Sequence, residues 1–221
     1  MRSTPDEPRA PLPPTLALFP LAGVLLLPRT HLPLHVFEPR YRALVHDAIA
    51  GNRILGLIQP VRADDPAGEP ELCTSGCAGR IAECDETEDG RFLITVTGLC
   101  RFDVTREVER TTPYRQVLVT YDRFRTDLDP QTRVLDAGLR RQVLEQARRY
   151  LSRFDQLIEW SSIERVADPV LVDVLATACP LGAREKQGLL EAISLTDRAR
   201  LLAAILEMSV AAPAGDAGAV H

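Results

Sequence analysis

The feature that most constrains the fold is a change in the spacing of apolar residues near Phe124. Before this residue the apolar runs are short and are separated by Pro and Gly, which is typical of short β-strands. After it, apolar residues recur at intervals of three and four, the period of an amphipathic helix. Strands followed by helices, without regular alternation, predict an α+β fold and not a doubly wound one.

The first half of the chain is predicted to be rich in strands and to contain one helix. Prolines as dense as those before Phe37 fit edge strands and barrel corners. A helix is expected after Glu38-Pro39, because Pro is tolerated in a first helical turn, and it should end at Gly51. Asp89-Gly90 predicts a hairpin turn. We expect strands at residues 16–19, 24–27, 32–37, 54–59, 79–84, 92–97, 100–107 and 115–121.

The second half is predicted to be a bundle of helices. Each helix has a start signal of a polar cap, a first-turn proline or a capping box. We expect helices to begin at Asp129-Pro130, at Asp168-Pro169, at Arg184 and at Ser194–Asp197. The predicted organisation is a flexible leader at residues 1–14, a β-rich domain at 15–124, a helical bundle at 125–209 and a flexible tail at 210–221.

Composition limits the possible partners. The net charge is −5 and aromatic residues make up 5% of the chain. Nucleic-acid binding draws on basic charge and, for single strands, on aromatic stacking, so a nucleic acid is not the expected partner. No apolar run is long enough to span a membrane, and the polar N-terminus lacks the pattern of a secretory signal. We therefore expect a cytoplasmic protein that does not contact the membrane.

The sequence lacks the motifs of common catalytic sites. It contains no phosphate-binding loop, no dinucleotide fingerprint and no G-x-S-x-G motif. Lys186 is the single lysine among 26 Lys and Arg residues, and no glycine-rich loop precedes it. Cys73, Cys77 and Cys84 form a cluster that lacks the second pair typical of structural zinc. We expect no catalytic residue, no cofactor and no metal site, with the cysteines reduced.

Two sets of charged residues can be interpreted either as functional sites or as ordinary solvated surface. Paired carboxylates can perform acid–base chemistry, but carboxylates around a hairpin turn usually form a solvated rim. Arginines on one helix can bind an acidic partner, but such a stripe is more often the solvent face of an amphipathic helix. The groups are Glu83, Asp85, Glu86, Glu88 and Asp89 near the predicted turn, and Arg140, Arg141, Arg148, Arg149 and Arg153 on the first helix of the bundle.

Several separated motifs resemble one known family. Residues 19–41 read FPLAGVLLLPRTHLPLHVFEPRY, and the segments GCAGRI, DGRFLI, GLCRF and AREKQGLLE follow at 76–81, 89–94, 98–102 and 183–191. In this order they are similar to the N-terminal substrate-binding domain of Lon proteases, over about residues 15–208. The resemblance implies a PUA-like β pseudo-barrel with one helix, followed by a helical bundle.

The resemblance also implies a function. In Lon this domain engages unfolded or degron-bearing proteins for an ATPase and a Ser–Lys protease, and this sequence carries the motifs of neither enzyme. It therefore implies a non-catalytic module that binds proteins or peptides, with an adaptor or chaperone-like role and Lon protease as a further candidate partner. An RNA-binding PUA-like module is the main alternative. A small-molecule receptor and an unrecognised enzyme remain open.

The motifs supply the candidate site residues. Exposed apolar residues are the usual anchors for a bound peptide, although a core position is the simpler interpretation for each candidate. The candidate anchors are Phe19, Leu21, Phe37 and Tyr41. We also hypothesise that Glu38 forms a structural ion pair with Arg80 or Arg101, which would fix the first helix against the strands.

Overall fold

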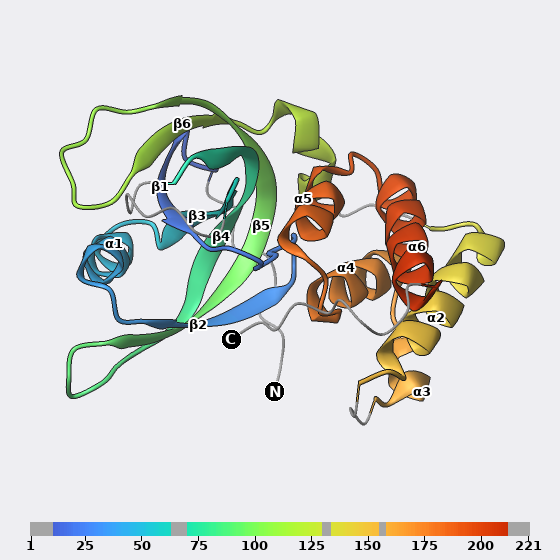
Figure 1. Ribbon diagram of the computed structural model, residues 1–221. Helices are drawn as coiled ribbons and strands as arrows, with labels where there is room; N and C mark the ends of the chain where they lie inside the picture. The colour runs from blue at the N-terminus through green and yellow to red at the C-terminus, as the bar shows by residue number, and fades with distance from the viewer. Residues whose placement is uncertain (1–10, 63–69, 130–133, 155–157, 212–221) are drawn as a thin grey trace.

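The computed structural model describes residues 11–62, 70–129, 134–154 and 158–211. The described strands come first, with one helix among them, and the other helices follow as a separate layer beside the strands (Figure 1). This order confirms the predicted α+β class. The elements are β1 (Thr15–Pro20), β2 (His31–Val36), α1 (Pro39–Ala50), β3 (Ile54–Pro60), β4 (Leu72–Glu86), β5 (Phe92–Glu107), β6 (Gln116–Thr120), the 3-10 helix η1 (Asp122–Leu128), α2 (Ala137–Leu151), α3 (Trp160–Ile163), α4 (Asp168–Ala178), α5 (Ala183–Glu191) and α6 (Leu195–Ala211).

Five of the six described strands close into a barrel. The sheet order is β2-β5-β4-β3-β1-β6, and a further pairing of β6 with β5 closes the ring. Strand β5 is 16 residues long, so its first half pairs with β2 and β4 while its last residues pair with β6. Strand β2 pairs antiparallel with β5 and lies outside the closed ring, at the edge of the sheet.

The barrel interior is filled by one aromatic ring and a layer of aliphatic side chains. Phe102 on β5 is fully buried, and its ring lies against the backbone at Gly76. A Cβ atom at Gly76 would lie 2.4 Å from the Leu57 carbonyl oxygen and 2.6 Å from Cζ of Phe102, so only glycine fits there without a shift. The other buried members of this cluster are Leu16, Leu18, Ile54, Ile58, Ala78 and Val117.

A second apolar cluster joins the outside of the barrel to the helices. It begins where Phe19 of β1 stacks on Tyr41 of α1, with ring centroids 4.4 Å apart. It also contains buried residues of the other strands and of the bundle helices, among them Leu206 of α6. The last helix contributes Ala199, Leu202, Ala203 and Leu206, which are all buried.

Two local signals in the sequence predicted the backbone correctly. Gly90 has a φ of 74° and lies in the turn between β4 and β5, in the left-handed region that glycine tolerates. The Ser194 hydroxyl accepts a hydrogen bond from the Asp197 backbone N–H at 3.0 Å, as a capping residue does at the start of α6.

Other expectations were wrong. Residues 24–27 form no strand, because Leu25, Leu26 and Leu27 are buried in a loop against the core. The two strands expected at 92–97 and 100–107 are one strand, since β5 continues through Gly98 with a register shift. The start expected at Asp129-Pro130 falls partly outside the described residues. Helix α2 begins at Ala137, where the Asp136 carboxylate accepts hydrogen bonds from the N–H groups of Gly138 and Leu139.

The predicted leader and tail lie mainly outside the described residues, at 1–10 and 212–221. The last residues of the predicted leader are bound to the barrel. The Tyr121 hydroxyl donates to the Pro13 carbonyl at 2.8 Å, and the Val119 N–H donates to the Pro14 carbonyl at 2.9 Å. Within the described part of the chain, no helix has the length and apolarity needed to cross a membrane.

Gly76→Ala should destabilise the barrel, because the new Cβ atom would collide with the Leu57 carbonyl and the Phe102 ring. We expect the free energy of unfolding in urea to fall by roughly 1–3 kcal/mol. The control is Gly188→Ala in α5, where the Cβ atom would meet Leu201 at an ordinary 3.5 Å. This control should gain up to about 1 kcal/mol from helix propensity. Equal effects of the two substitutions would contradict this account of the barrel core.

Candidate functional site

Two of the four candidate anchors belong to the core. Phe19 and Tyr41 are 4% and 7% exposed and stack on each other, so neither can contact a partner without unpacking α1 from the barrel. Leu21 is half-buried against the same cluster. Phe37 differs from the other three, because 59% of its surface is exposed. Of the four candidates, Phe37 and the half-buried Leu21 therefore keep side-chain surface exposed to solvent.

The hypothesis that Glu38 pairs with Arg80 or Arg101 was wrong. Glu38 instead accepts from Arg40, two residues along the chain, at 2.9 Å on a half-exposed surface. Arg101 is fully buried and pairs with Asp127. Among the described residues, Arg80 has no ion pair with Glu38. The hypothesis joined the three residues because each belongs to a family-like motif, but the Arg101 side chain instead contacts α5 of the bundle.

Arg101 joins the barrel to the helical bundle. Its Nε and Nη2 atoms donate to the two oxygens of Asp127 at 2.8 and 2.9 Å, in the bidentate geometry that suits a guanidinium and a carboxylate. Its Nη1 atom donates to the Leu190 carbonyl at the end of α5 at 2.8 Å. The guanidinium also lies over the Phe124 ring, 4.3 Å from its centroid. One side chain therefore ties β5, η1 and α5 together.

A charged residue between two buried neighbours was the available signal for this role. Cys100 and Phe102 flank Arg101 and are both fully buried, and arginine is rarely buried without a partner. The sequence gives no means of choosing Asp127 from the many acids, because the pair is separated by 26 residues. The contact was therefore missed.

A second buried pair lies inside the bundle. Arg198 of α6 donates to Asp173 of α4 at 2.7 Å and to the Leu189 carbonyl at 3.0 Å. Burial raises the pKa of Asp173 above its usual value, although the Arg198 charge acts in the other direction. Burial likewise lowers the pKa of Arg198. Desolvation thus opposes both charges, so the pair fixes the position of α6 against α4 more than it stabilises the fold.

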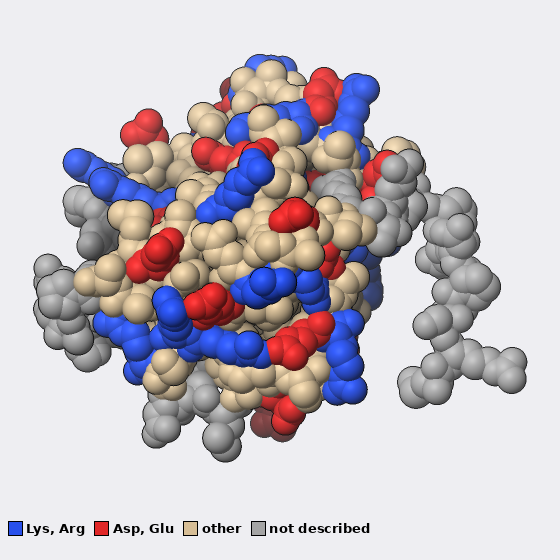
Figure 2. Space-filling view, turned by 90° about the vertical axis from the view of Figure 1, so that its right-hand side faces the viewer, with Lys and Arg blue, Asp and Glu red and all other residues tan. Residues whose placement is uncertain are grey.

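The arginines of α2 are largely occupied by contacts within the bundle. Arg140 pairs with Asp168 and donates to the Val166 carbonyl, and Arg148 pairs with Glu164. Arg149 pairs with Glu145 on its own helix. On the face of the molecule in Figure 2, basic and acidic side chains are interspersed and form no single field of one sign. This face has the character of a solvated helix surface.

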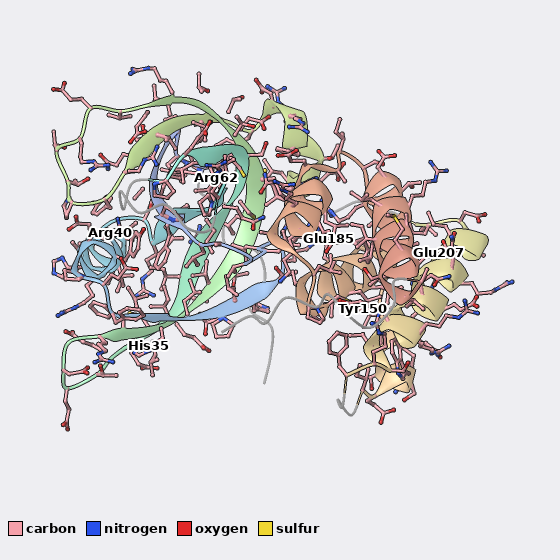
Figure 3. The ribbon with its side chains drawn as sticks, viewed as in Figure 1. His35, Arg40, Arg62, Tyr150, Glu185 and Glu207 are labelled. Atoms are coloured by element: carbon pink, nitrogen blue, oxygen red, sulfur yellow. The ribbon has the colours of Figure 1, made fainter. Side chains whose placement is uncertain are left out.

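The outer face of β2, β5 and β4 carries Leu93, one of the exposed apolar residues of the barrel. We define it by three rows of paired residues: His31–Thr97–Arg80, Pro33–Thr95–Glu83 and His35–Leu93–Asp85. Leu93 is 48% exposed, and His35 extends from β2 away from the barrel interior (Figure 3). The Phe37 ring lies next to His35, with centroids 5.9 Å apart. Phe37 thus continues the outer face beyond the end of β2.

This face contains a shallow depression. Its volume is about 350 Å³, and its lining residues are Pro33, Leu34, His35, Glu83, Asp85, Leu93, Ile94 and Thr95. The lining combines exposed apolar surface with two carboxylates and the polar groups of Thr95 and His35. A void between barrel and bundle, beside Leu26 and Leu190, is much smaller, with about 10 Å³. Of these two hollows the depression on the outer face is the larger.

The open edge of β2 is poorly suited to receive an added strand. The Gly98 N–H donates to the Thr30 carbonyl, which fixes the phase of the ladder. Residues 32, 34 and 36 then direct their backbone groups toward β5, and residues 31, 33 and 35 direct theirs to the open edge. Pro33 at the centre of that edge has no N–H to donate. A ligand is therefore better placed on the outer face than along the edge.

The buried cysteines and the lysine bear on whether the described residues could act as nucleophiles. Burial raises the pKa of the Cys100 and Cys179 thiols to about 12, so both stay protonated and are poor nucleophiles. The Lys186 ammonium donates to the Gly23 carbonyl at 2.8 Å in a half-buried position. No group of His, Cys, Asp and Glu in the described part of the chain has the arrangement of a metal site.

Comparison with known proteins identifies the relatives of this chain. The family model for the ATP-dependent protease La (LON) substrate-binding domain matches residues 15–208. Lon protease 2 of Myxococcus xanthus is 28% identical over 201 residues, covering 88% of this chain and 24% of the relative. A Lon protease of Anaeromyxobacter dehalogenans is 28% identical over 202 residues, covering 88% of this chain and 23% of the relative. The chain therefore spans about a quarter of the length of these relatives.

Solved structures agree with this assignment. The crystal structure of a Lon N-terminal domain protein from Xanthomonas campestris is similar with a TM-score of 0.62 and 25% identity, covering 86% of this chain and 97% of that one. The N-terminal domain of a Mycobacterium avium complex Lon protease gives a TM-score of 0.59 at 19% identity, covering 87% and 98%. The second likeness concerns the fold alone.

Arg101→Met should strongly destabilise the protein, because it leaves the Asp127 carboxylate buried without its partner. Breaking a buried pair in this way costs about 3–5 kcal/mol of unfolding free energy. Arg125→Met is the control, since the Arg125–Asp122 pair is well exposed and should contribute less than about 1 kcal/mol. Urea unfolding measures both variants. A loss for Arg101→Met no larger than that of the control would refute the role assigned to the buried pair.

Proposed function

The chain belongs to the family of Lon substrate-binding domains, and from this membership we propose that it binds unfolded or extended protein segments without carrying out catalysis itself. The relatives that it matches are named as Lon proteases, in which such a domain is joined to further sequence about three times its length. Unfolded proteins, peptides and Lon protease itself are the proposed partners, and an adaptor or chaperone-like role follows from them.

The observation that carries the proposal is the exposure of Phe37 and Leu93 on the outer face. Phe37 is 59% exposed and Leu93 is 48% exposed, although both belong to segments whose other apolar residues are buried or partly buried. Exposed apolar side chains beside a depression can contact the apolar residues that an unfolded segment exposes and that a folded protein buries. The shallowness of the depression suits a flexible chain better than a compact ligand.

The non-catalytic part of the proposal rests on chemistry. The buried thiols are protonated, the one lysine is bound to a backbone carbonyl, and the sequence contains no phosphate-binding loop. A nucleophile needs an adjacent base. At the outer face the Thr97 hydroxyl lies 3.0 Å from Nδ1 of His31 and the Thr95 hydroxyl donates to Glu83, both at exposed positions that water can reach. The surface provides contact area and charge, which are the requirements of binding.

The RNA-binding alternative finds no support in the charges. The net charge is −5, and the lining of the depression contains Glu83 and Asp85 but no Lys or Arg. A nucleic acid would bring further negative charge to this surface, where phosphate contacts normally require Lys or Arg. We therefore place a protein segment on this face, and RNA serves as the negative control in binding experiments.

The double substitution Phe37→Asp and Leu93→Asp should weaken the binding of a reduced, carboxymethylated unfolded protein at least about tenfold, since it removes two apolar contacts of about 1 kcal/mol or more each. Fluorescence anisotropy of the labelled unfolded protein measures the Kd. Both side chains are exposed in the free protein, so the fold should be retained, and thermal unfolding checks this.

Val134→Asp together with Val61→Asp is the matched control. These valines are 74% and 50% exposed and lie away from the outer face, so the control adds the same charge at sites of similar exposure. It should bind with a Kd within about twofold of the wild type. Equal losses of affinity in the two double variants would show that the outer face is not the binding surface.

A further inference from the structure

We propose that the outer face selects protein segments in which Lys or Arg side chains accompany an apolar residue. This inference rests on the proposed function, because it names the chemistry of the segments that this face binds. The depression combines an exposed leucine with two carboxylates, and charge complementarity identifies the partner as basic.

The carboxylates of the depression are not neutralised by a neighbouring arginine. Several other acids of the barrel and η1 do lie beside an arginine: Glu38 with Arg40, Asp89 with Arg91, Glu107 with Arg115, Asp103 with Arg123, and Asp122 with Arg125. Within the described ranges, Glu83 and Asp85 have no Lys or Arg partner. Glu83 accepts one hydrogen bond from the Thr95 hydroxyl at 3.0 Å. Both carboxylates therefore keep acceptor capacity toward a basic ligand.

The register of the strands places these charges beside the apolar surface. Asp85 lies directly across from Leu93, and Glu83 lies across from Thr95 in the next row. Side chains directly opposite in an antiparallel pair have Cβ atoms about 5 Å apart. An apolar side chain in contact with Leu93 is thus within reach of a basic side chain bound to Asp85 or Glu83.

The spacing of the two acids matches an extended ligand. Residues i and i+2 of a strand point to the same side and are about 6.6 Å apart. Glu83 and Asp85 have this relationship along β4, and so do alternate side chains of a bound extended segment. Arg80 lies beside Thr97, in the row farthest from Leu93. The outer face is therefore acidic at the Leu93 end and basic at the Thr97 end. The preferred segments should carry their Lys or Arg one or two positions from the apolar residue.

The test uses two fluorescein-labelled peptides with the same apolar residues, one flanked by Lys and the other by Glu, titrated with the full chain. Exposed ion pairs are individually weak, so we expect the basic peptide to bind about tenfold more tightly at about 0.05 M salt. The preference should shrink to about twofold at about 0.5 M salt, where exposed charges are screened. Fluorescence anisotropy gives both dissociation constants.

Glu83→Gln combined with Asp85→Asn should reduce this preference to about twofold, while the apolar contacts remain. The matched control is Glu88→Gln combined with Glu109→Gln, which removes the same charge from exposed positions outside the depression. The control should keep the preference of the wild type. If the first variant keeps it, or if both variants lose it equally, the preference comes from the net charge and the inference is overturned.

The outcomes also separate this inference from the proposed function. If the two peptides bind the wild type equally, and Phe37→Asp with Leu93→Asp weakens both, the outer face binds segments without charge selection and only this inference fails. If neither peptide binds, or if binding is insensitive to Phe37→Asp with Leu93→Asp, the proposed function fails together with it.

Discussion

The arrangement of barrel and bundle depends on the buried guanidinium of Arg101. Its contacts reach the Asp127 carboxylate and the last carbonyls of α5, so the strand, the 3-10 helix and the bundle are fixed by one planar group. Arg suits this position because its fork of donors satisfies a carboxylate and several carbonyls at once, and because its charge persists when buried. The apolar cluster that spans both halves provides most of the stabilisation, but it is not directional. The hydrogen bonds of the Arg101 guanidinium are satisfied in one orientation of the two halves, and they favour that orientation.

Buried charges of this kind contribute specificity at an energetic cost. Asp173 and Arg198 repeat the arrangement inside the bundle, where burial opposes ionisation of both groups. An apolar pair of similar size would often stabilise a protein as well or better. It would not select one position of α6 against α4, whereas a carboxylate and a guanidinium do.

The candidate binding surface follows from the strand order. Since β2 lies outside the closed ring and pairs with β5 alone, the helices of the bundle do not cover the outer face of β2, β5 and β4. Pro33 limits strand addition at the open edge, so contacts are directed to the side chains of the face. Exposed apolar groups and unpaired carboxylates thus lie together on a rigid sheet. The contacts that hold the fold and the contacts proposed for the ligand use different residues.

The sequence by itself determined the order of strands and helices, the hairpin turn at Gly90 and the cap at Ser194, because periodicity, positive φ and capping act over a few residues. It also determined the family, through motifs that are contiguous in the chain. Only the tertiary structure decided the continuity of β5 and the burial of residues 24–27, since each depends on what the segment packs against. It also assigned Phe19 and Tyr41 to the core, exposed Phe37, and gave Arg101 its partner Asp127. Those outcomes depend on contacts between residues distant in the chain, which local patterns do not encode.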